Sequence, residues 1–322
     1  IVLYLVNLFM IKVHFKSPSA NVRYALDVEK SWEKSWEKIW YSITALWLVL
    51  NILCVAVTAI KLILLNLLIA QIIAPILVMI PCVIYLVATT GNLDKDTLIT
   101  MLMIPAQLAG QLMMGIYLWK AGYISMQKTT WSPVSAGYLS CSALAILTAG
   151  FAVSALMGLL DWIPNIMEQS FDILQSGWGG ILAISIIGPV LEELLFRGAI
   201  TKALLQQYSP AKAILIAAFL FGVFHINPAQ ILPAFLIGIL LAWTFYKTGS
   251  LIPCILMHIL NNSLSVFLST KYPEAENMSD LMNTSSYLIA IFVAVLILAG
   301  VIWAMRRTTV RYPWKEETNI TD

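Results

Sequence analysis

The chain has 322 residues, of which 60% are hydrophobic and only 11% are charged. A soluble protein usually carries about twice that charged fraction, and the mean hydropathy of +0.85 also excludes an ordinary soluble domain. The net charge of +2 is small and spread along the chain, so it predicts no nucleic-acid partner. We therefore expect an integral protein of the lipid bilayer with an all-α fold.

Residues 1–40 are predicted to form a truncated N-terminal span followed by an amphipathic segment. Trp32, Trp36 and Trp40 recur every four residues and so share one helical face, with Glu and Lys elsewhere. This pattern is typical of a helix lying at the membrane interface. An ordinary charged lead-in to the next span explains the pattern equally well.

The rest of the chain is a series of apolar stretches of roughly 20 residues, the length that crosses a bilayer. They lie near 41–60, 63–88, 98–119, 136–160, 178–206, 211–226, 229–247, 251–270 and 285–305. The sequence thus predicts a polytopic transmembrane helical bundle with about eight to ten spans. We divide it into N-terminal transmembrane helices (41–177), a chemically distinctive core (178–270), and a final span with a basic tail (271–322).

The charges in the loops predict which loops share a side of the membrane. The C-terminal tail is rich in arginine, which places it in the cytosol by the positive-inside rule, in a cell (plasma) membrane. Counting back, the 271–284 and 161–177 loops fall outside. The turn at Lys247 and the loops at 202–212 and 120–135 fall inside with the tail.

The core contains three charged residues that a membrane span should not tolerate. Glu192, Glu193 and Arg197 directly follow an apolar run, and each costs at least about 2.5–3.5 kcal/mol at the centre of a span. Glu193 and Arg197 are four residues apart with the acid first, the favourable order for an ion pair. Glu192 points about 100° away from Glu193 on a helix, so it remains available as a general base. A structural charge cluster that braces the bundle is the other interpretation.

Two of the three histidines in the chain follow in the next predicted spans. His225 comes one helical turn after Phe221, which can stack on its ring, and His258 precedes Asn262 by four residues on one helical face. Together with Glu192 they resemble a water-activating site, in which Glu192 and His225 deprotonate water and His258 and Asn262 hold an oxyanion. The same carboxylate and imidazoles, Glu192, His225 and His258, are also a familiar ligand set for catalytic zinc.

The runs EELLFR (192–197), FGVFH (221–225) and HILNN (258–262) resemble the three motifs of the CAAX protease and bacteriocin-processing (CPBP) family, E-E-x-x-x-R, F-x-x-x-H and H-x-x-x-N/D. The resemblance covers about residues 178–270. It implies an intramembrane endopeptidase similar to the type II CAAX prenyl protease, acting on a peptide or membrane-protein substrate. It gives Glu192, His225, His258 and Asn262 the catalytic roles and makes Glu193 and Arg197 a supporting pair. Members are described both as metal-dependent and as glutamate-type peptidases, so zinc stays an open cofactor.

Two other classes of function remain open on the residues alone. Buried Glu, His and Arg also build the proton relays of proton-coupled transporters, and a non-catalytic immunity or scaffold protein can bind a peptide in the same cavity. The peptidase interpretation requires Glu192 and His225 to lie at the same depth in the membrane. If the helix carrying Glu192 ended at Arg197, Glu192 would lie only about 9 Å from one membrane face, against about 21 Å for His225. We therefore predict that this helix continues to about Gln207.

Overall fold

The computed structural model describes residues 38–44, 46, 57–132, 134–275 and 277–307. The chain divides into two compact units, 1–53 and 54–322. In the first unit the described residues are helical and include only Trp40 of the predicted interfacial face, so the interfacial prediction lies mostly outside the described residues. In the second unit the regular structure of the described residues is entirely helical.

Seven helices of the described residues are long and apolar enough to cross a membrane: Val57–Thr90, Lys95–Lys120 (α4), Ala136–Met157 (α5), Trp178–Gln207, Pro228–Thr248 (α11), Leu251–Lys271 (α12) and Thr284–Arg307 (α13). The first of these contains a π-helical turn, Ile69–Ile73 (η1), and ends in α3 (Ala74–Thr90). The all-α polytopic bundle predicted from the sequence is confirmed.

Two predicted spans differ from the structure. The sequence predicts separate spans at 41–60 and 63–88, with Lys61 between them. In the structure the helix Val57–Thr90 runs through Lys61, because no Pro or Gly near this lysine interrupts it. The predicted span near 211–226 is α10 (Pro210–Phe224), only 15 residues long. At 1.5 Å per residue it extends about 22 Å, less than the roughly 30 Å of a bilayer core, so it is short for a span, and the chain turns after it into α11.

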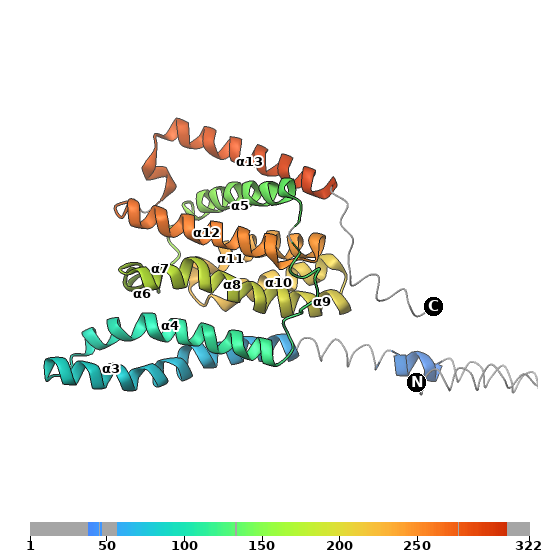
Figure 1. The fold of residues 1–322 in the computed structure, drawn as a ribbon. Helices are drawn as coiled ribbons and strands as arrows, with labels where there is room; N and C mark the ends of the chain where they lie inside the picture. Colours follow the sequence, from blue (N-terminus) through green and yellow to red (C-terminus); the bar gives the residue numbers. More distant parts are fainter. Residues whose placement is uncertain (1–37, 45, 47–56, 133, 276, 308–322) are drawn as a thin grey trace, which may run out of the picture. The chain divides into compact units, whose positions relative to one another are not determined.

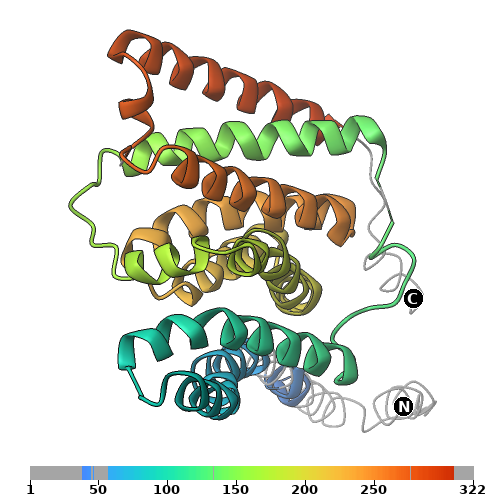
Figure 2. The ribbon, with the colours of Figure 1, turned by 60° about the vertical axis from the view of Figure 1, so that its left-hand side comes forward.

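The helices of this unit form layers (Figures 1 and 2). α3 and α4 pack together on one side, α5 and α13 pack together on the other, and α8, α10, α11 and α12 lie between them. The middle layer contains most of the buried side chains, whereas α13 buries few. This arrangement puts residues 178–270 at the centre of the bundle.

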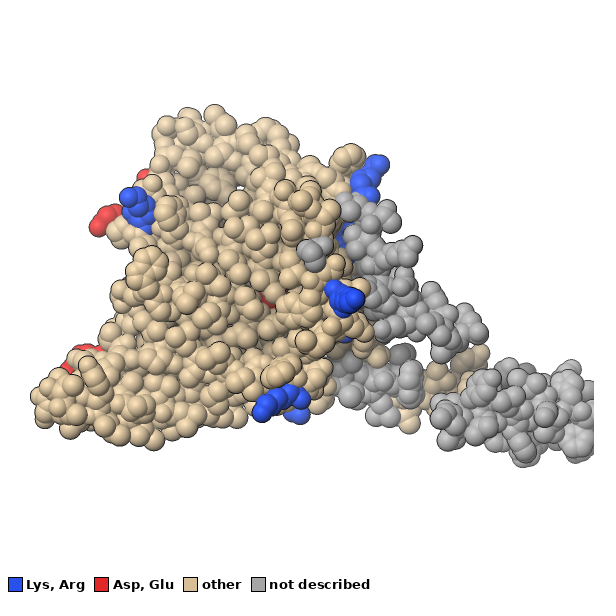
Figure 3. All heavy atoms as spheres, in the orientation of Figure 1, with Lys and Arg blue, Asp and Glu red and all other residues tan. Residues whose placement is uncertain are grey.

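The loops sort into two ends as the sequence predicts. At one end the 121–135 segment meets the start of α12, where Leu251 N donates to Thr130 O at 2.8 Å, and Lys247 Nζ donates to Arg306 O at 3.3 Å. At the other end Ser269 Oγ donates to Gln175 Oε1 at 2.5 Å. In Figure 3 most blue surface lies toward the first end, at the right, and the red surface lies mainly at the left. The cytosolic assignment of the first end remains a prediction.

Candidate functional site

The helix that carries the charged residues is continuous over 30 residues, Trp178–Gln207. It comprises α7 (Trp178–Leu182), the π-helix η2 (Ala183–Ile187), α8 (Gly188–Glu193), the π-helix η3 (Leu194–Thr201) and α9 (Lys202–Gln207). The predicted continuation to Gln207 is therefore confirmed. π-helical turns shift the hydrogen-bond register and are frequent at functional sites, and here they lie on both sides of α8, which ends in the two glutamates.

Glu193 and Arg197 form the ion pair that their spacing predicts. Arg197 Nη1 donates to Glu193 Oε1 at 2.8 Å, and the two side chains are 1% and 0% exposed. Arg197 Nη2 also donates to the backbone oxygen of Gly238 on α11 at 3.2 Å, and its guanidinium lies 4.5 Å from the centre of the Phe221 ring. A buried charge is tolerated only when paired and hydrogen-bonded, and this pair joins the α8–η3 helix to α10 and α11.

His225 and His258 each use the Nδ1 atom for a contact within the protein. His225 Nδ1 lies 2.8 Å from Phe221 O, and His258 Nδ1 lies 2.8 Å from Glu193 Oε1. A backbone carbonyl can only accept, and the Glu193 carboxylate already accepts from Arg197, so both Nδ1 atoms carry the hydrogen. Phe221 packs edge-on against both rings, with centroid distances of 4.9 Å to His225 and 5.7 Å to His258, rather than stacking on His225.

The free Nε2 atoms of the two histidines face the same carboxylate oxygen. Glu192 Oε2 lies 4.0 Å from His225 Nε2 and 3.8 Å from His258 Nε2. This oxygen is buried and has no hydrogen-bond partner among the described residues. With both Nδ1 hydrogens directed elsewhere, the two Nε2 atoms, from the end of α10 and from α12, lie near one carboxylate oxygen of α8. A water molecule bound there can donate its two hydrogens to two of these three acceptors.

Asn262 lies one helical turn beyond His258 and has a different set of partners. Its Nδ2 donates to the backbone oxygen of Ile184 at 3.1 Å, and its Oδ1 accepts from Asn261 Nδ2 at 3.3 Å. Ile184 belongs to η2, where the π-helical register alters which carbonyls the helix itself uses. The structure thus brings Glu192, His225 and His258 together, while one N–H of Asn262 fastens α12 to the helix that carries Glu192.

Comparison with known proteins matches this same part of the chain. Residues 174–264 match the family described as "Type II CAAX prenyl endopeptidase Rce1-like". This region contains the three motifs that resemble those of the CPBP family. Over 101 residues the chain is also 29% identical to "Putative membrane peptidase YdiL" of Bacillus subtilis (strain 168), an alignment that covers 31% of this chain and 41% of that relative. The chain therefore spans about two fifths of the relative's length. No solved structure matches the chain.

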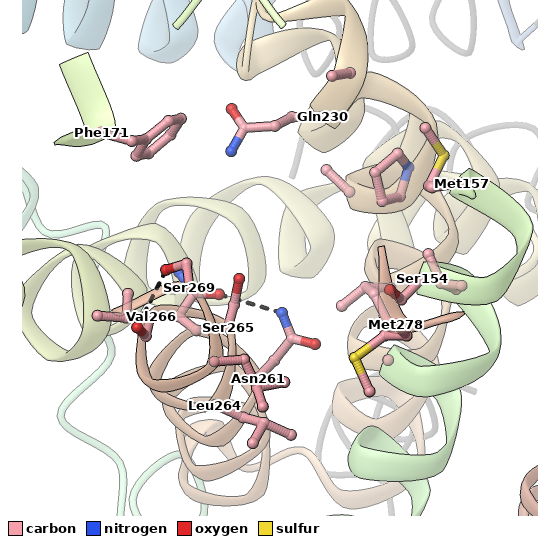
Figure 4. A pocket seen from close by; sticks show the side chains of 18 of the residues that line it. Ser154, Met157, Phe171, Gln230, Asn261, Leu264, Ser265, Val266, Ser269 and Met278 are labelled. Atoms are coloured by element: carbon pink, nitrogen blue, oxygen red, sulfur yellow. Dashed lines mark hydrogen bonds between the residues drawn. The ribbon is translucent and has the colours of Figure 1, made fainter. Parts of the chain in front are cut away.

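A cavity of about 700 Å³ opens beside this region. His225, His258 and Asn262 line it, and it continues toward the end of the bundle where α12 meets the 158–177 segment. Figure 4 shows part of its wall, in which Asn261, Ser265 and Ser269 come from α12 and Gln230 comes from α11. Its volume is within the range of sites that bind small ligands or short peptide segments.

One element of this wall, the short helix α6 (Glu168–Gln175), was not predicted, because its residues were assigned to a loop. Its residues Glu168, Phe171, Asp172 and Gln175 line the cavity. The i, i+4 spacing of Glu168 and Asp172 was a signal that both lie on one helical face. Only the tertiary fold shows that this face meets the cavity.

The metal alternative receives limited support from the geometry. Glu192, His225 and His258 are chemically suited to zinc. However, within the described ranges no three His, Cys, Asp or Glu side chains have the arrangement of a metal site. Glu192 Oε2 and His225 Nε2 can instead accept the two hydrogens of a water molecule.

Proposed function

We propose that this protein is an intramembrane endopeptidase that hydrolyses a peptide bond of a membrane-associated peptide or protein. The observation that carries the proposal is the convergence of Glu192 Oε2 with the Nε2 atoms of His225 and His258, two histidines that line a cavity. The match to a prenyl endopeptidase family and to a relative named as a membrane peptidase supports the same reaction class.

In the proposed reaction Glu192 and His225 activate the water. The water donates its hydrogens to Glu192 Oε2 and His225 Nε2, which orients an oxygen lone pair toward the substrate carbonyl. As the new C–O bond forms, Glu192 takes one proton and the carbonyl oxygen becomes an oxyanion. The C–N bond then breaks, and Glu192 returns the proton to the departing nitrogen, which leaves a carboxylic acid and an amine.

His258 and Asn262 are proposed to stabilise the oxyanion. His258 Nδ1 contacts Glu193 and its Nε2 faces the reaction centre, so the imidazolium form of His258 directs an Nε2–H at the developing oxyanion. The second N–H of Asn262, which the bond to Ile184 leaves unused, supplies the other donor.

Phe221, Glu193 and Arg197 act as positioning residues in this scheme. Arg197 holds Glu193, Glu193 fixes the tautomer of His258, and the Phe221 carbonyl fixes that of His225. A base oriented through its second ring nitrogen is a recurring feature of hydrolytic sites. None of these three residues needs to contact the substrate.

The test is proteolysis by the purified protein in liposomes, with a mixture of synthetic peptides of about a dozen residues and mass spectrometry of the products. We expect cleavage by the wild type and a loss on the order of 10²–10⁴-fold in Glu192→Gln and in His225→Ala. Unchanged cleavage by Glu192→Gln would overturn the mechanism. Activity that survives a strong chelator removes the zinc version, in which Glu192, His225 and His258 bind the ion, while activity lost on chelation and restored by zinc favours it.

A further inference from the structure

The turn that follows His225 has a strained backbone. Asn227 N donates to His225 O at 2.6 Å, and this bond closes a three-residue turn with Ile226 at its centre. Ile226 has a φ of 61°, the one positive φ among the described residues other than glycine, and a β-branched residue disfavours this conformation. The Ile226 side chain is 52% exposed, so its own packing does not explain the strain.

The side chain of Asn227 does not serve its own helix. Asn227 is the N-cap residue of α11, where an asparagine usually accepts a hydrogen bond from an amide of the first turn. Within the described part of the chain it makes no such bond. Instead its Nδ2 donates to Asn165 Oδ1 at 2.8 Å, and its Oδ1 accepts from Ile166 N at 3.1 Å. Asn227 is only 1% exposed, so both bonds are shielded from competing water.

These two bonds join the turn after His225 to a distant segment of the chain. Asn165 and Ile166 lie between α5 and α6, about sixty residues before Asn227. Asn165 is itself held in place, because its Oδ1 also accepts from Met167 N at 3.3 Å, next to the start of α6. Asn165, His225 and Asn227 all line the cavity beside the reaction centre. The wall of the cavity is thus fastened to the residue that follows the strained Ile226.

A strained residue persists only where its surroundings hold it in place. Without the side-chain bonds of Asn227, the favoured change is a return of Ile226 to negative φ. α10 and α11 pack closely against each other on either side of the turn, so the turn itself, with His225 in it, has to absorb that change. The His225 ring depends on this backbone, because its Nδ1 is bonded to Phe221 O and its Nε2 faces Glu192.

We propose that Asn227 is a positioning residue for His225. Through Asn165 and Ile166 it holds the turn in the conformation that Ile226 disfavours, and this conformation keeps His225 Nε2 directed at Glu192. The proposal rests on the proposed peptidase function and adds to it a residue outside the three motifs. Asn227 acts through His225 and not on the substrate.

The test compares peptide cleavage by the wild type, Asn227→Ala, Ile226→Gly, the double variant Ile226→Gly/Asn227→Ala and a control, all in liposomes. The control is Asn283→Ala. Asn283 Oδ1 accepts from a backbone amide at the start of α13 at 2.9 Å, and Asn283 does not line the cavity, so this variant loses a comparable bond elsewhere. Rates are divided by the folded fraction of each variant, measured by tryptophan fluorescence.

We expect Asn227→Ala to lower kcat by roughly 10- to 100-fold with KM unchanged, because a misplaced group slows the chemical step without weakening substrate binding. The control keeps the wild-type kcat. The double variant should recover most of the loss relative to Ile226→Gly, because glycine adopts positive φ without strain and the turn then no longer needs the bonds of Asn227. A wild-type kcat in Asn227→Ala overturns the proposal, and so does a double variant as slow as Asn227→Ala.

The His225 ring is observed separately by NMR, so that a failure of the peptidase function leaves a test of the positioning role. The chain has three histidines, so isotope-labelled histidine gives few ring signals, and His225→Gln identifies those of His225. At about pH 9, where imidazoles are mostly neutral, the wild type in nanodiscs should show His225 as one tautomer, with the hydrogen on Nδ1 bonded to Phe221 O.

In Asn227→Ala we expect the His225 signals to shift toward a mixture of tautomers while those of His258 stay in place, and the double variant should restore the single tautomer. Unchanged His225 signals in Asn227→Ala overturn the proposal whether or not any peptide is cleaved. A wild type that cleaves no peptide but shows these spectral changes refutes the peptidase function alone and supports the role of Asn227 in holding His225.

Discussion

The buried Arg197 offers the sharpest test of the energetics of this site. Its guanidinium is 1% exposed and contacts three partners: Glu193 at 2.8 Å, the backbone of Gly238 at 3.2 Å, and the Phe221 ring at 4.5 Å. Arg197→Met keeps much of the side-chain volume but leaves Glu193 with only His258 to offset its charge. Removing one partner of a buried ion pair typically costs about 3–5 kcal/mol, and we expect the free energy of unfolding to fall by that amount.

The double variant Glu193→Gln/Arg197→Met separates charge from packing. It removes both charges, and the amide oxygen that replaces the carboxylate can still accept from His258, so the loss of stability should be clearly smaller than for Arg197→Met alone. Lys202→Met, on the same continuous helix but outside the buried pair, is the control and should change stability by less than about 0.5 kcal/mol.

The assay is equilibrium unfolding in mixed micelles by titration with SDS, followed by the fluorescence of the 11 tryptophans. A loss below about 1 kcal/mol for Arg197→Met would refute the reasoning. So would a double variant that is less stable than the single one, because an uncompensated Glu193 charge would then not be the cause.

Three further changes test the packing around the site by the same unfolding assay. Gly238→Ala would place a Cβ 3.1 Å from Phe221 Cδ1 and should lower the free energy of unfolding by about 1–3 kcal/mol. The control Gly300→Ala meets nothing within 4 Å and should leave stability unchanged or increase it. Equal effects of the two substitutions would contradict the close packing of α10 on α11. Ile226, next to His225, has a φ of 61°, which costs a β-branched residue about 1–2 kcal/mol, so Ile226→Gly should stabilise by up to about 1 kcal/mol and Ile226→Val should not. Ser250 is buried at the N-cap of α12, where its hydroxyl accepts from Ile252 N and donates to Ser132 O in the preceding loop at 2.8 Å. Ser250→Ala should lower the free energy of unfolding by about 1–3 kcal/mol. A smaller loss would contradict a stabilising role for these two hydrogen bonds.

Local spacing was sufficient to predict several features of the site. The i, i+4 separation of Glu193 and Arg197 determines their pairing on any helix, whatever surrounds it. The continuation of the helix to Gln207 followed from requiring Glu192 and His225 to meet, since their sequence positions implied different depths. Both features are present in the structure.

Features that depend on long-range contacts were not accessible from the sequence. The contact between His258 and Glu193 joins residues 65 positions apart, and the bond from Asn262 to Ile184 depends on a π-helical turn for which hydrophobic periodicity gives no signal. The bounds of α10 were predicted to within two residues, but the helix was counted as a full span although its 15 residues extend only about 22 Å. The acids of α6 were assigned to an outer loop because eight residues of mixed polarity give no span-length apolar signal.

The central claim is that Glu192 and His225 act together on one water molecule, and a kinetic double-mutant cycle tests it most directly. Peptide cleavage is measured for the wild type, Glu192→Gln, His225→Gln and the double variant, reconstituted under identical conditions. Because residues that act as a unit are strongly non-additive, the double variant should be no slower than the slower single variant, with both single variants slowed by about 10²-fold or more. Losses that multiply in the double variant, or a single variant that keeps the wild-type rate, would contradict the claim.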